Sequence, residues 1–398
     1  MTAFPLEFIL FGAVLIGVAV LHHKPLLVTL SGLTAILLYK VLLTPMGLGG
    51  LGVHFSHEWV VLANLMLLLV GFAVLSNHFE QSHIPDAIPS VLPDNWTGGL
   101  LLLGIVFCLS AVLDNIAAAV IGGVMARHAY DGRAGVGFLA AIVAAANAGG
   151  AGSVLGDTTT TMMWIDGISP FLLLDAFIAS IAAFAVFAPI AAWRQEKVGP
   201  ITRAAHDVRP IDWMRAVVVV ILLLTVVATN AIANGFFPGV EEHVPLLGIA
   251  LWLAILVTSM IRRPGWNVAP EASHGALFLV ALVACASLMP VEELPVASWA
   301  TALGLGFLSA AFDNIPLTAL ALEQGGYDWA LLAFAVGFGG SMVWFGSSAG
   351  VALTNDYPEA RSVIAWVREG WFVIVAYLVG FFVMLALLGW NPAPLLHG

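Results

Sequence analysis

The stretch LSAVLDNI at Leu109–Ile116 returns 199 positions later as LSAAFDNI at Leu308–Ile315. Six of the eight positions are identical, and the two copies fall at equivalent points of two halves of similar length. Each copy carries an Asp-Asn pair in the middle of an otherwise apolar segment. We therefore expect two related halves, each interrupted by a polar pair at the same place.

A second match follows downstream, at an offset of 190 positions. Gly149, Gly150 and Gly156 of the first half correspond to Gly339, Gly340 and Gly346 of the second. The nine-residue difference between the two offsets fits the longer polar loop Ala126–Gly135 of the first half. The repeat therefore extends well beyond the Asp-Asn pair.

The composition indicates a membrane protein. Apolar residues make up 61% of the 398 positions and charged residues only 9%, whereas soluble domains carry about 25% charged residues. A net charge of −11 argues against nucleic acid as a partner, because binding to nucleic acid requires a basic face. The expected partner is therefore the lipid bilayer.

A membrane-spanning helix needs about 20 mostly apolar residues. Ten segments fit: Phe4–Leu21, Leu26–Leu43, Trp59–Ser76, Leu139–Trp164, Phe171–Trp193, Trp213–Asn234, Val244–Ile261, His274–Met289, Ala330–Leu353 and Trp371–Leu388. Two further stretches, Thr97–Ala126 and Ala300–Leu322, are broken by the Asp-Asn pairs into short arms typical of re-entrant hairpins.

The distribution of Lys and Arg favours this hairpin arrangement. If both broken stretches are hairpins, twelve of the thirteen basic residues lie in the cytoplasm and only Lys40 lies outside. If both cross the membrane, the division is ten to three, because Lys24, Arg361 and Arg368 move out and Lys40 moves in. The hairpin arrangement follows the positive-inside rule better. It predicts both termini in the periplasm and outward loops that are acidic, at Asp166, Glu241-Glu242, Glu292-Glu293 and Asp328.

The predicted fold is an all-α polytopic membrane protein with five crossings and one re-entrant hairpin per half, and with discontinuous helices at the midplane. Residues 1–197 form the first repeat, 198–212 a cytoplasmic linker and 213–398 the second repeat. Since five is odd, the second repeat must be inverted in the bilayer. Inverted repeats with broken helices are typical of secondary transporters.

Asp114 and Asp313, with their neighbours Asn115 and Asn314, are the first candidate site residues. An unpaired carboxylate at the bilayer centre costs at least about 2.5–3.5 kcal/mol, so it is retained mainly where it faces water, binds a proton or pairs with a cation. The alternative is that the pairs only cap the helices that follow them. Asn or Ser would cap without the charge, so we favour a functional role.

The glycine-rich stretch Ala148–Thr161 supplies further candidates. Glycines let the backbone leave the helix and expose carbonyls, and carboxylate and hydroxyl oxygens suit a hard cation such as Na⁺. The candidates in this stretch are Gly150, Asp157, Thr158 and Thr159, and Asn147, in the helix that leads into it, is a further candidate. The alternative is a packing surface followed by a capped helix.

The second half has Ser347 where the first has Asp157, followed by Ser348. The two halves therefore differ in charge, and the first is the better candidate for the ion site. His78, His83, His128 and His274 fall at span ends or loops and are expected to be solvated. The sequence offers neither a phosphate-binding loop nor a nucleophile triad, so neither an enzyme nor a cofactor other than the coupling ion is expected.

At these motifs the sequence resembles the NhaD-type sodium/proton antiporters of the ion transporter superfamily, which also holds citrate and arsenite carriers. Matching motifs are Asp114–Ala119, Ala146–Ala151, Gly156–Thr159, Asp313–Pro316 and Gly346–Ala352. The family threonines after the first Asp-Asn pair are Ala117 and Ala118 here. The resemblance implies Na⁺ coordination by Asp114, Asn115, Asp157, Asp313 and Asn314, elevator-like motion, a homodimer and a bacterial inner-membrane location.

Three functions remain open from the sequence. The leading one is Na⁺(Li⁺)/H⁺ antiport, in which both ions compete for the carboxylates. The second is a carboxylate carrier coupled to Na⁺ or H⁺, since helix N-termini and hydroxyls can hold an anion. The third, a scaffold without transport, leaves the cost of the buried charges unexplained.

Overall fold

The structure of the chain is a computed structural model, described for residues 5–393 except 22–23, 85–91, 202–209, 237–239 and 241–242. These residues form helices, turns and loops, with no β-strand among them. Glu241 and Glu242, two of the expected outward acidic residues, lie outside the described residues.

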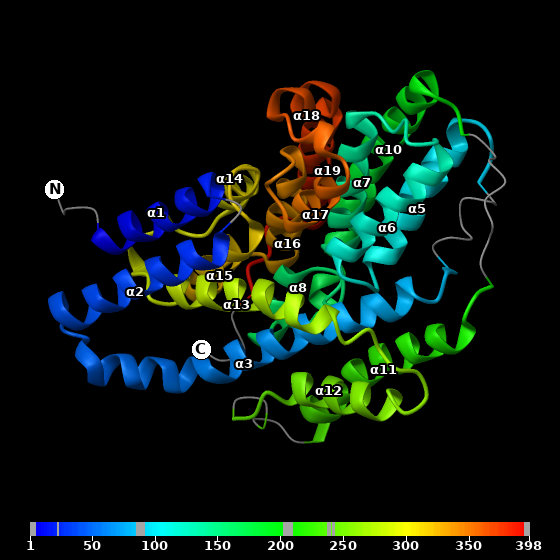
Figure 1. Ribbon diagram of the computed structural model, residues 1–398. Coiled ribbons are helices and arrows are strands. Elements are labelled where there is room, and N and C mark those ends of the chain that lie inside the picture. The colour runs from blue at the N-terminus through cyan, green and yellow to red at the C-terminus, as the bar shows by residue number, and fades with distance from the viewer. Residues whose placement is uncertain are drawn as a thin grey trace. The chain divides into compact units, whose positions relative to one another are not determined.

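The first half of the chain contains the following helices (Figure 1): α1 (Leu6–Val20), α2 (Pro25–Leu43), α3 (Gly47–Glu80), α5 (Trp96–Ser110), α6 (Asn115–Ala129), α7 (Val136–Gly150), α8 (Thr158–Ile165), α9 (Pro170–Leu173) and α10 (Ala176–Val198). The second half contains α11 (Trp213–Phe236), α12 (Leu246–Thr258), α13 (Val268–Ala286), α14 (Trp299–Ser309), α15 (Asn314–Gln324), α16 (Trp329–Gly339), α17 (Ser348–Asp356), α18 (Val363–Glu369) and α19 (Trp371–Leu388), with 3₁₀ turns at Val291–Glu293, Gly340–Met342 and Pro358–Ala360.

The expectation of a multi-pass helical membrane protein is confirmed. Six of the described helical segments are long and apolar enough to cross a membrane, and six shorter apolar helices accompany them. The long ones are Pro25–Leu43, Gly47–Glu80, Pro170–Val198, Trp213–Asn230, Val268–Ala286 and Trp371–Leu388. α12 is shorter than the expected span Val244–Ile261, because it begins after Pro245 and gives way to turns after Thr258.

The chain divides into two compact units, and each unit takes segments from both halves. Unit 1 comprises Met1–His78, Met214–Leu294 and Ala319–Gln324, and so contains α1–α3 and α11–α13. Unit 2 comprises Phe79–Trp213, Pro295–Thr318 and Gly325–Gly398, and contains both Asp-Asn pairs and the glycine-rich breaks, whereas α15 is divided because its residues Ala319–Gln324 belong to unit 1. Equivalent segments of the two halves thus fold together.

Polar contacts tie the helices of unit 1 together within an apolar surrounding. The Asn64 side chain on α3 accepts a hydrogen bond from the backbone N–H of Gly248 at 3.0 Å, and Trp252 Nε1 donates to the Leu67 carbonyl at 2.9 Å. Lys40 Nζ on α2 lies 3.1 Å from Glu7 Oε1 on α1, with both side chains nearly buried. Each buried polar group named here therefore has a partner.

The expectation that His78 is solvated is wrong. α3 continues to Glu80, past the expected end of the span at Ser76, and His78 is fully buried. Its Nδ1 lies 3.1 Å from Nη1 of Arg215, which lies in the first turn of α11. Because a guanidinium only donates, Nδ1 must accept, and the imidazole is neutral with its proton on Nε2.

The core of unit 2 is the helix pair α7 and α16, which contact each other (Figure 1). All residues of Phe138–Gly150 and all residues of α16 are buried. Both segments consist mainly of Ala, Gly and larger apolar residues, so neighbouring helices can approach closely. The packing of unit 2 is therefore built around the two helices that lead into the glycine-rich breaks.

The same close contacts occur in both halves of unit 2. Ser110 Oγ donates to the Ala146 carbonyl at 2.6 Å, and Ser309 Oγ donates to the Val336 carbonyl at 2.6 Å. A Cβ at Gly149 would collide with the Phe107 carbonyl, and a Cβ at Gly339 would collide with the Gly306 carbonyl. These equivalences follow the offsets of 199 and 190, so the sequence repeat corresponds to a repeated set of contacts.

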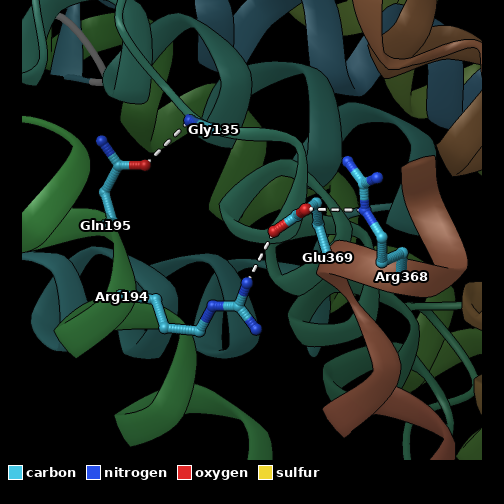
Figure 2. Close-up of polar contacts among 5 residues, drawn as sticks. All are labelled: Gly135, Arg194, Gln195, Arg368 and Glu369. Atoms are coloured by element: carbon cyan, nitrogen blue, oxygen red, sulfur yellow. Dashed lines mark hydrogen bonds and ion pairs between the residues drawn. The ribbon is translucent and has the colours of Figure 1, made fainter.

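Polar contacts connect several segments at one end of unit 2 (Figure 2). Glu369 Oε2 lies 2.6 Å from Arg194 Nη2, and Glu369 Oε1 lies 3.1 Å from Arg368 Nε. Gln195 accepts from the backbone N–H of Gly135 at 2.8 Å. It also donates to the Arg133 carbonyl at 3.0 Å. The end of α10, the loop before α7 and the residues before α19 therefore lie together.

Gly149→Ala tests the close packing in the core of unit 2. The added methyl group meets backbone atoms of Phe107, which cannot rotate away, so we expect the free energy of unfolding to fall by about 3 kcal/mol. Thermal unfolding of the detergent-purified protein measures the change. Gly104→Ala is the control, because its methyl group would meet only the Phe184 ring at 3.9 Å. Equal melting temperatures for the two variants would contradict the packing described here.

Candidate functional site

Four interruptions of helices in unit 2 carry the polar candidates. The turns Ala111–Asp114 and Ala310–Asp313 each join two short helices, α5 to α6 and α14 to α15. The breaks at residues 151–157 and 340–347 separate α7 from α8 and α16 from α17. Helix carboxyl ends and amino ends therefore alternate around this region, and both carry unpaired backbone groups and opposite partial charges.

Asp157 lies at the first break, as the N-cap residue of α8. The Asp157 side chain is buried, with 2% of its surface exposed, and Oδ1 accepts a hydrogen bond from the Thr159 N–H at 3.2 Å. Asn314 Nδ2 lies 3.4 Å from each carboxylate oxygen, at the long end of hydrogen bonding. The asparagine of the second Asp-Asn pair thus contacts the Asp157 carboxylate at the first break.

Asn147 connects the first hairpin turn to the second break. Asn147 Oδ1 accepts from Asn115 Nδ2 at 3.1 Å, and Asn147 Nδ2 donates to Ser341 Oγ at 2.9 Å and to Ser347 Oγ at 3.1 Å. All four side chains are buried. Because a buried amide is costly when unpaired, this network fixes the relative positions of the two segments.

Asp313 both caps the helix that follows it and forms a side-chain contact with the second break. Asp313 Oδ1 accepts from the Ile315 N–H at 3.1 Å, and Oδ2 accepts from Ser348 Oγ at 2.8 Å. Both carboxylate oxygens therefore have protein donors, and the side chain is half-buried. Asp313 is the most completely hydrogen-bonded of the three candidate carboxylates.

Asp114 differs from its counterpart Asp313. It faces the first backbone N–H groups of α6 but forms none of the close cap hydrogen bonds that Asp157 and Asp313 form. Thr158 is equivalent to Ser348 in the repeat, yet the described contacts include no hydrogen bond between Thr158 and Asp114. The following residues Ala117 and Ala118 add no hydroxyl groups. Asp114 therefore interacts mainly with the backbone N–H groups at the start of α6 and with no hydroxyl donor among the described contacts.

The threonines after Asp157 play different parts. Thr160 Oγ1 donates within hydrogen-bond distance of the Ser153 and Asp157 carbonyls, and Thr161 Oγ1 does the same with the Val154 and Asp157 carbonyls. These two hydroxyls stabilise the break. Thr159 Oγ1, by contrast, is fully buried beside the Asp157 carboxylate and forms no hydrogen bond of normal geometry within the described part of the chain.

At the two glycine pairs, the absence of a side chain lets backbone segments approach each other closely. A Cβ at Gly150 would collide with the Gly156 carbonyl, and a Cβ at Gly340 would come too close to the Gly346 carbonyl. Gly150, a candidate from the sequence, therefore lets the first break close on itself. Its own contribution to a site can come only from its backbone.

Burial of three carboxylates is the main electrostatic feature of the region, and repulsion between Asp157 and the other two adds to it. Asp157 lies close enough to Asp114 and to Asp313 for the charges to interact, and no Lys or Arg among the described residues balances the three carboxylates. They do not form a cluster suited to a resident metal ion, among the residues described. The arrangement can instead accept monovalent cations or protons, each of which relieves the repulsion.

Ser341 joins this region without having been a candidate from the sequence. It accepts from Asn147 and lies in the 3₁₀ turn Gly340–Met342, which follows α16. The offset of 190 pairs it with Ala151, so the repeat alone gives no reason to single it out. The signal that could have identified it is a hydroxyl residue directly after a glycine pair, where the helix breaks.

The chain has relatives among curated proteins, although no protein-family model matches it. It is 29% identical to sodium/proton antiporter 1 of Arabidopsis thaliana over 75% of this chain and 57% of that protein. It is 26% identical to the Na(+)/H(+) antiporter NhaD of Alkalimonas amylolytica over 86% of this chain and 80% of that protein. It is 27% identical to NhaD of Vibrio parahaemolyticus over 75% of this chain and 84% of that protein.

The chain thus spans less than two thirds of the Arabidopsis protein's length but most of the length of the two bacterial ones. All three are named as transporters, which agrees with the expectation that this protein is not an enzyme. The resemblance seen in the Asp-Asn and glycine-rich motifs is confirmed over most of the chain: this protein is a relative of the NhaD-type sodium/proton antiporters.

Proposed function

We propose that the protein exchanges Na⁺ or Li⁺ for H⁺ across a membrane, and that Asp157 is the principal cation ligand. The observation that carries the proposal is a buried carboxylate beside a buried hydroxyl, Thr159 Oγ1, which interacts with Asp157 but forms no hydrogen bond of normal geometry in the described structure. A buried hydroxyl without a good hydrogen bond costs free energy, and a cation would provide a better partner. Asp114, Asn115, Asp313 and Asn314 supply the surrounding oxygens and charge.

Exchange follows from competition for these carboxylates. Three acidic side chains repel each other and lack a basic partner among the described residues, so either a cation or a proton lowers the energy of the site. A cation that binds Asp157 disfavours protonation, and a proton on the carboxylate disfavours the cation. The Asn314 amide, at 3.4 Å from both Asp157 oxygens, is held loosely enough to yield to a cation.

The helix ends add to this electrostatic arrangement. α7 and α16 end at the two breaks, and the carboxyl ends of broken helices coordinate cations in many secondary transporters. α8 begins at the first break, and its amino end stabilises the ionised form of Asp157 through the Thr159 N–H. The site can therefore hold a carboxylate in its charged form without a basic side chain.

The proposed topology is an inverted repeat with two re-entrant hairpins and both termini in the periplasm. The contact between Arg194 and Glu369 supports it, because it brings the end of α10 to the residues before α19. Because the end of α10 lies beside the start of α19, these two helices run antiparallel. They are equivalent in the repeat, so the antiparallel directions agree with an inverted repeat. Arg194 and Arg368 also share one side, whereas full crossings of both Asp-Asn segments would separate them.

The proposed transport motion is elevator-like, in a homodimer located in the bacterial inner membrane. Two compact units, each assembled from equivalent segments of both halves, are the division that such a motion needs. Unit 2 contains the candidate site, and unit 1 is suited to the role of the fixed scaffold. The carboxylate carrier considered from the sequence receives no support from the named relatives.

Removing the charge of Asp157 tests the proposed site. In everted vesicles, Na⁺ or Li⁺ should release protons from an acidified interior. For Asp157→Asn, we expect the cation concentration for half-maximal response to rise by about tenfold to a hundredfold, because a charged ligand is lost. Asp131→Asn is the control, since Asp131 is exposed in a loop with a φ of 52°, which Asn tolerates. A response in the Asp157 variant equal to that of the control would contradict the assignment.

Thr159→Val separates cation binding from stability. The variant loses no hydrogen bond of normal geometry within the described structure, so we expect its melting temperature to stay close to that of the unmodified protein. Its half-maximal Na⁺ concentration should rise by about fivefold, the effect of one neutral ligand. Thr160→Val should behave in the opposite way, with a lower melting temperature, because it loses contacts to two carbonyls. A Thr159 variant with unchanged Na⁺ dependence would exclude this hydroxyl as a ligand.

Competition predicts the direction of the pH dependence. As the pH falls, protons occupy the carboxylates, so the half-maximal Na⁺ concentration should rise, approaching about tenfold per pH unit when one proton excludes one cation. At high pH it should become constant. Proton-flux measurements at a series of pH values, equal on both sides of the vesicle membrane, test this. A half-maximal concentration that falls on acidification would rule out a shared site.

A further inference from the structure

Gly337 and Asn147 occupy equivalent positions in the two halves, at the offset of 190. Asn147, on α7, reaches the second break and donates to Ser341 and Ser347. Gly337, on α16, faces the first break in the same way. A Cβ built on Gly337 would lie 3.7 Å from Ala151 Cβ and 2.9 Å from Asp157 Oδ2, and these two residues are the equivalents of Ser341 and Ser347.

The two breaks are therefore closed differently. At the second break, the Asn147 amide supplies two donors to neutral serine hydroxyls. At the first break, the facing helix supplies no side chain, and the Asp157 carboxylate lies directly against the helix backbone. The same point beside Gly337 is 4.0 Å from Thr159 Oγ1. Two oxygens suited to a cation thus converge where the other half has the amide of an asparagine.

We infer that Gly337 is a positioning residue that sets the size selectivity of the Asp157 site, an inference that rests on the proposed cation exchange. The missing side chain lets Asp157 Oδ2 and Thr159 Oγ1 approach α16 together. A methyl group at position 337 displaces Oδ2, because 2.9 Å is shorter than a normal contact between carbon and oxygen. The displaced carboxylate narrows the space for the ion, so Na⁺ is affected more than the smaller Li⁺.

The difference between the halves also explains why only one break would hold the ion. At the second break, the NH₂ group of Asn147 already occupies the position facing Ser347 and satisfies both hydroxyls. A cation at the second break would meet only neutral hydroxyl oxygens, and the NH₂ group of Asn147 would occupy its position. At the first break, the ligand is charged and the donor is absent from the facing helix.

The test compares Gly337→Ala with Gly304→Ala in everted vesicles, with Na⁺ and Li⁺ assayed separately. Gly304 lies on α14 with no described atom within 4 Å of an added Cβ, so it controls for the substitution itself. For Gly337→Ala we expect a half-maximal Na⁺ concentration at least about tenfold higher and a smaller rise for Li⁺, so that the preference shifts toward Li⁺. Equal changes for both ions, or no change, would overturn the inference.

The unmodified protein separates this inference from the proposed function. If it responds to Na⁺ or Li⁺ and the Gly337 variant shows no shift in preference, only the role of Gly337 is lost. If the unmodified protein neither exchanges these ions nor is stabilised by them on heating, both fail.

A double-mutant cycle covers the case in which Gly337→Ala lowers the amount of folded protein. Gly337→Asn combined with Asp157→Ser copies the pairing of Asn147 with Ser347 into the first break. We expect the double variant to melt at a higher temperature than the sum of the single changes predicts, because the amide gains its hydroxyl partner. Additive melting temperatures would show that position 337 does not face position 157 as inferred.

Discussion

The constraint on which the rest of unit 2 depends is the burial of acidic side chains without basic partners. A carboxylate removed from water must be hydrogen-bonded, protonated or paired with a cation. Asp313 has donors on both oxygens, whereas Asp157 has one close backbone donor and a distant amide. The protein thus compensates one carboxylate with its own groups and leaves another incompletely compensated. In the proposed function, that difference is what makes binding of an ion at Asp157 favourable.

Holding such charges requires a backbone that can end helices in the interior. Unpaired amide and carbonyl groups are tolerated in a membrane protein only where other groups satisfy them. Thr160, Thr161 and Ser153 bond to carbonyls of the first break and the adjoining turn, and the glycines allow the chain to fold back on itself. The small residues of α7 and α16 then let these irregular segments pack at the centre of unit 2. Close packing and the polar site are therefore consequences of the same residues.

Much of the fold could be predicted from the sequence, because apolar length and the repeat are local or periodic signals. The helix breaks follow from the Asp-Asn pairs and the glycine pairs, and the structure has them where the sequence places them. His78 was misjudged because its burial depends on the length of α3 and on Arg215, which is far away in the chain. Ser341 and Gly337 were missed for a related reason. Their importance lies in what faces them across the helix pair, and a sequence shows only what precedes and follows a residue.

An approximate twofold repeat that differs in charge has a mechanical consequence. Identical scaffolding contacts, such as those of Ser110 and Ser309, keep the two breaks alike in shape. Ser347 is the equivalent of Asp157, and Gly337 is the equivalent of Asn147. These differences change the charge and the hydrogen-bond donors at one break while the surrounding backbone contacts stay the same. Asn314 bonds to the Asp157 carboxylate, whereas Asn115 bonds to the Asn147 amide. The two Asp-Asn turns therefore contact side chains of different charge. In the proposed site, a cation that draws Asp157 away from Asn314 alters the contact of the second Asp-Asn turn and leaves the contact of Asn115 with Asn147 in place. Occupancy of one site therefore affects the two turns unequally.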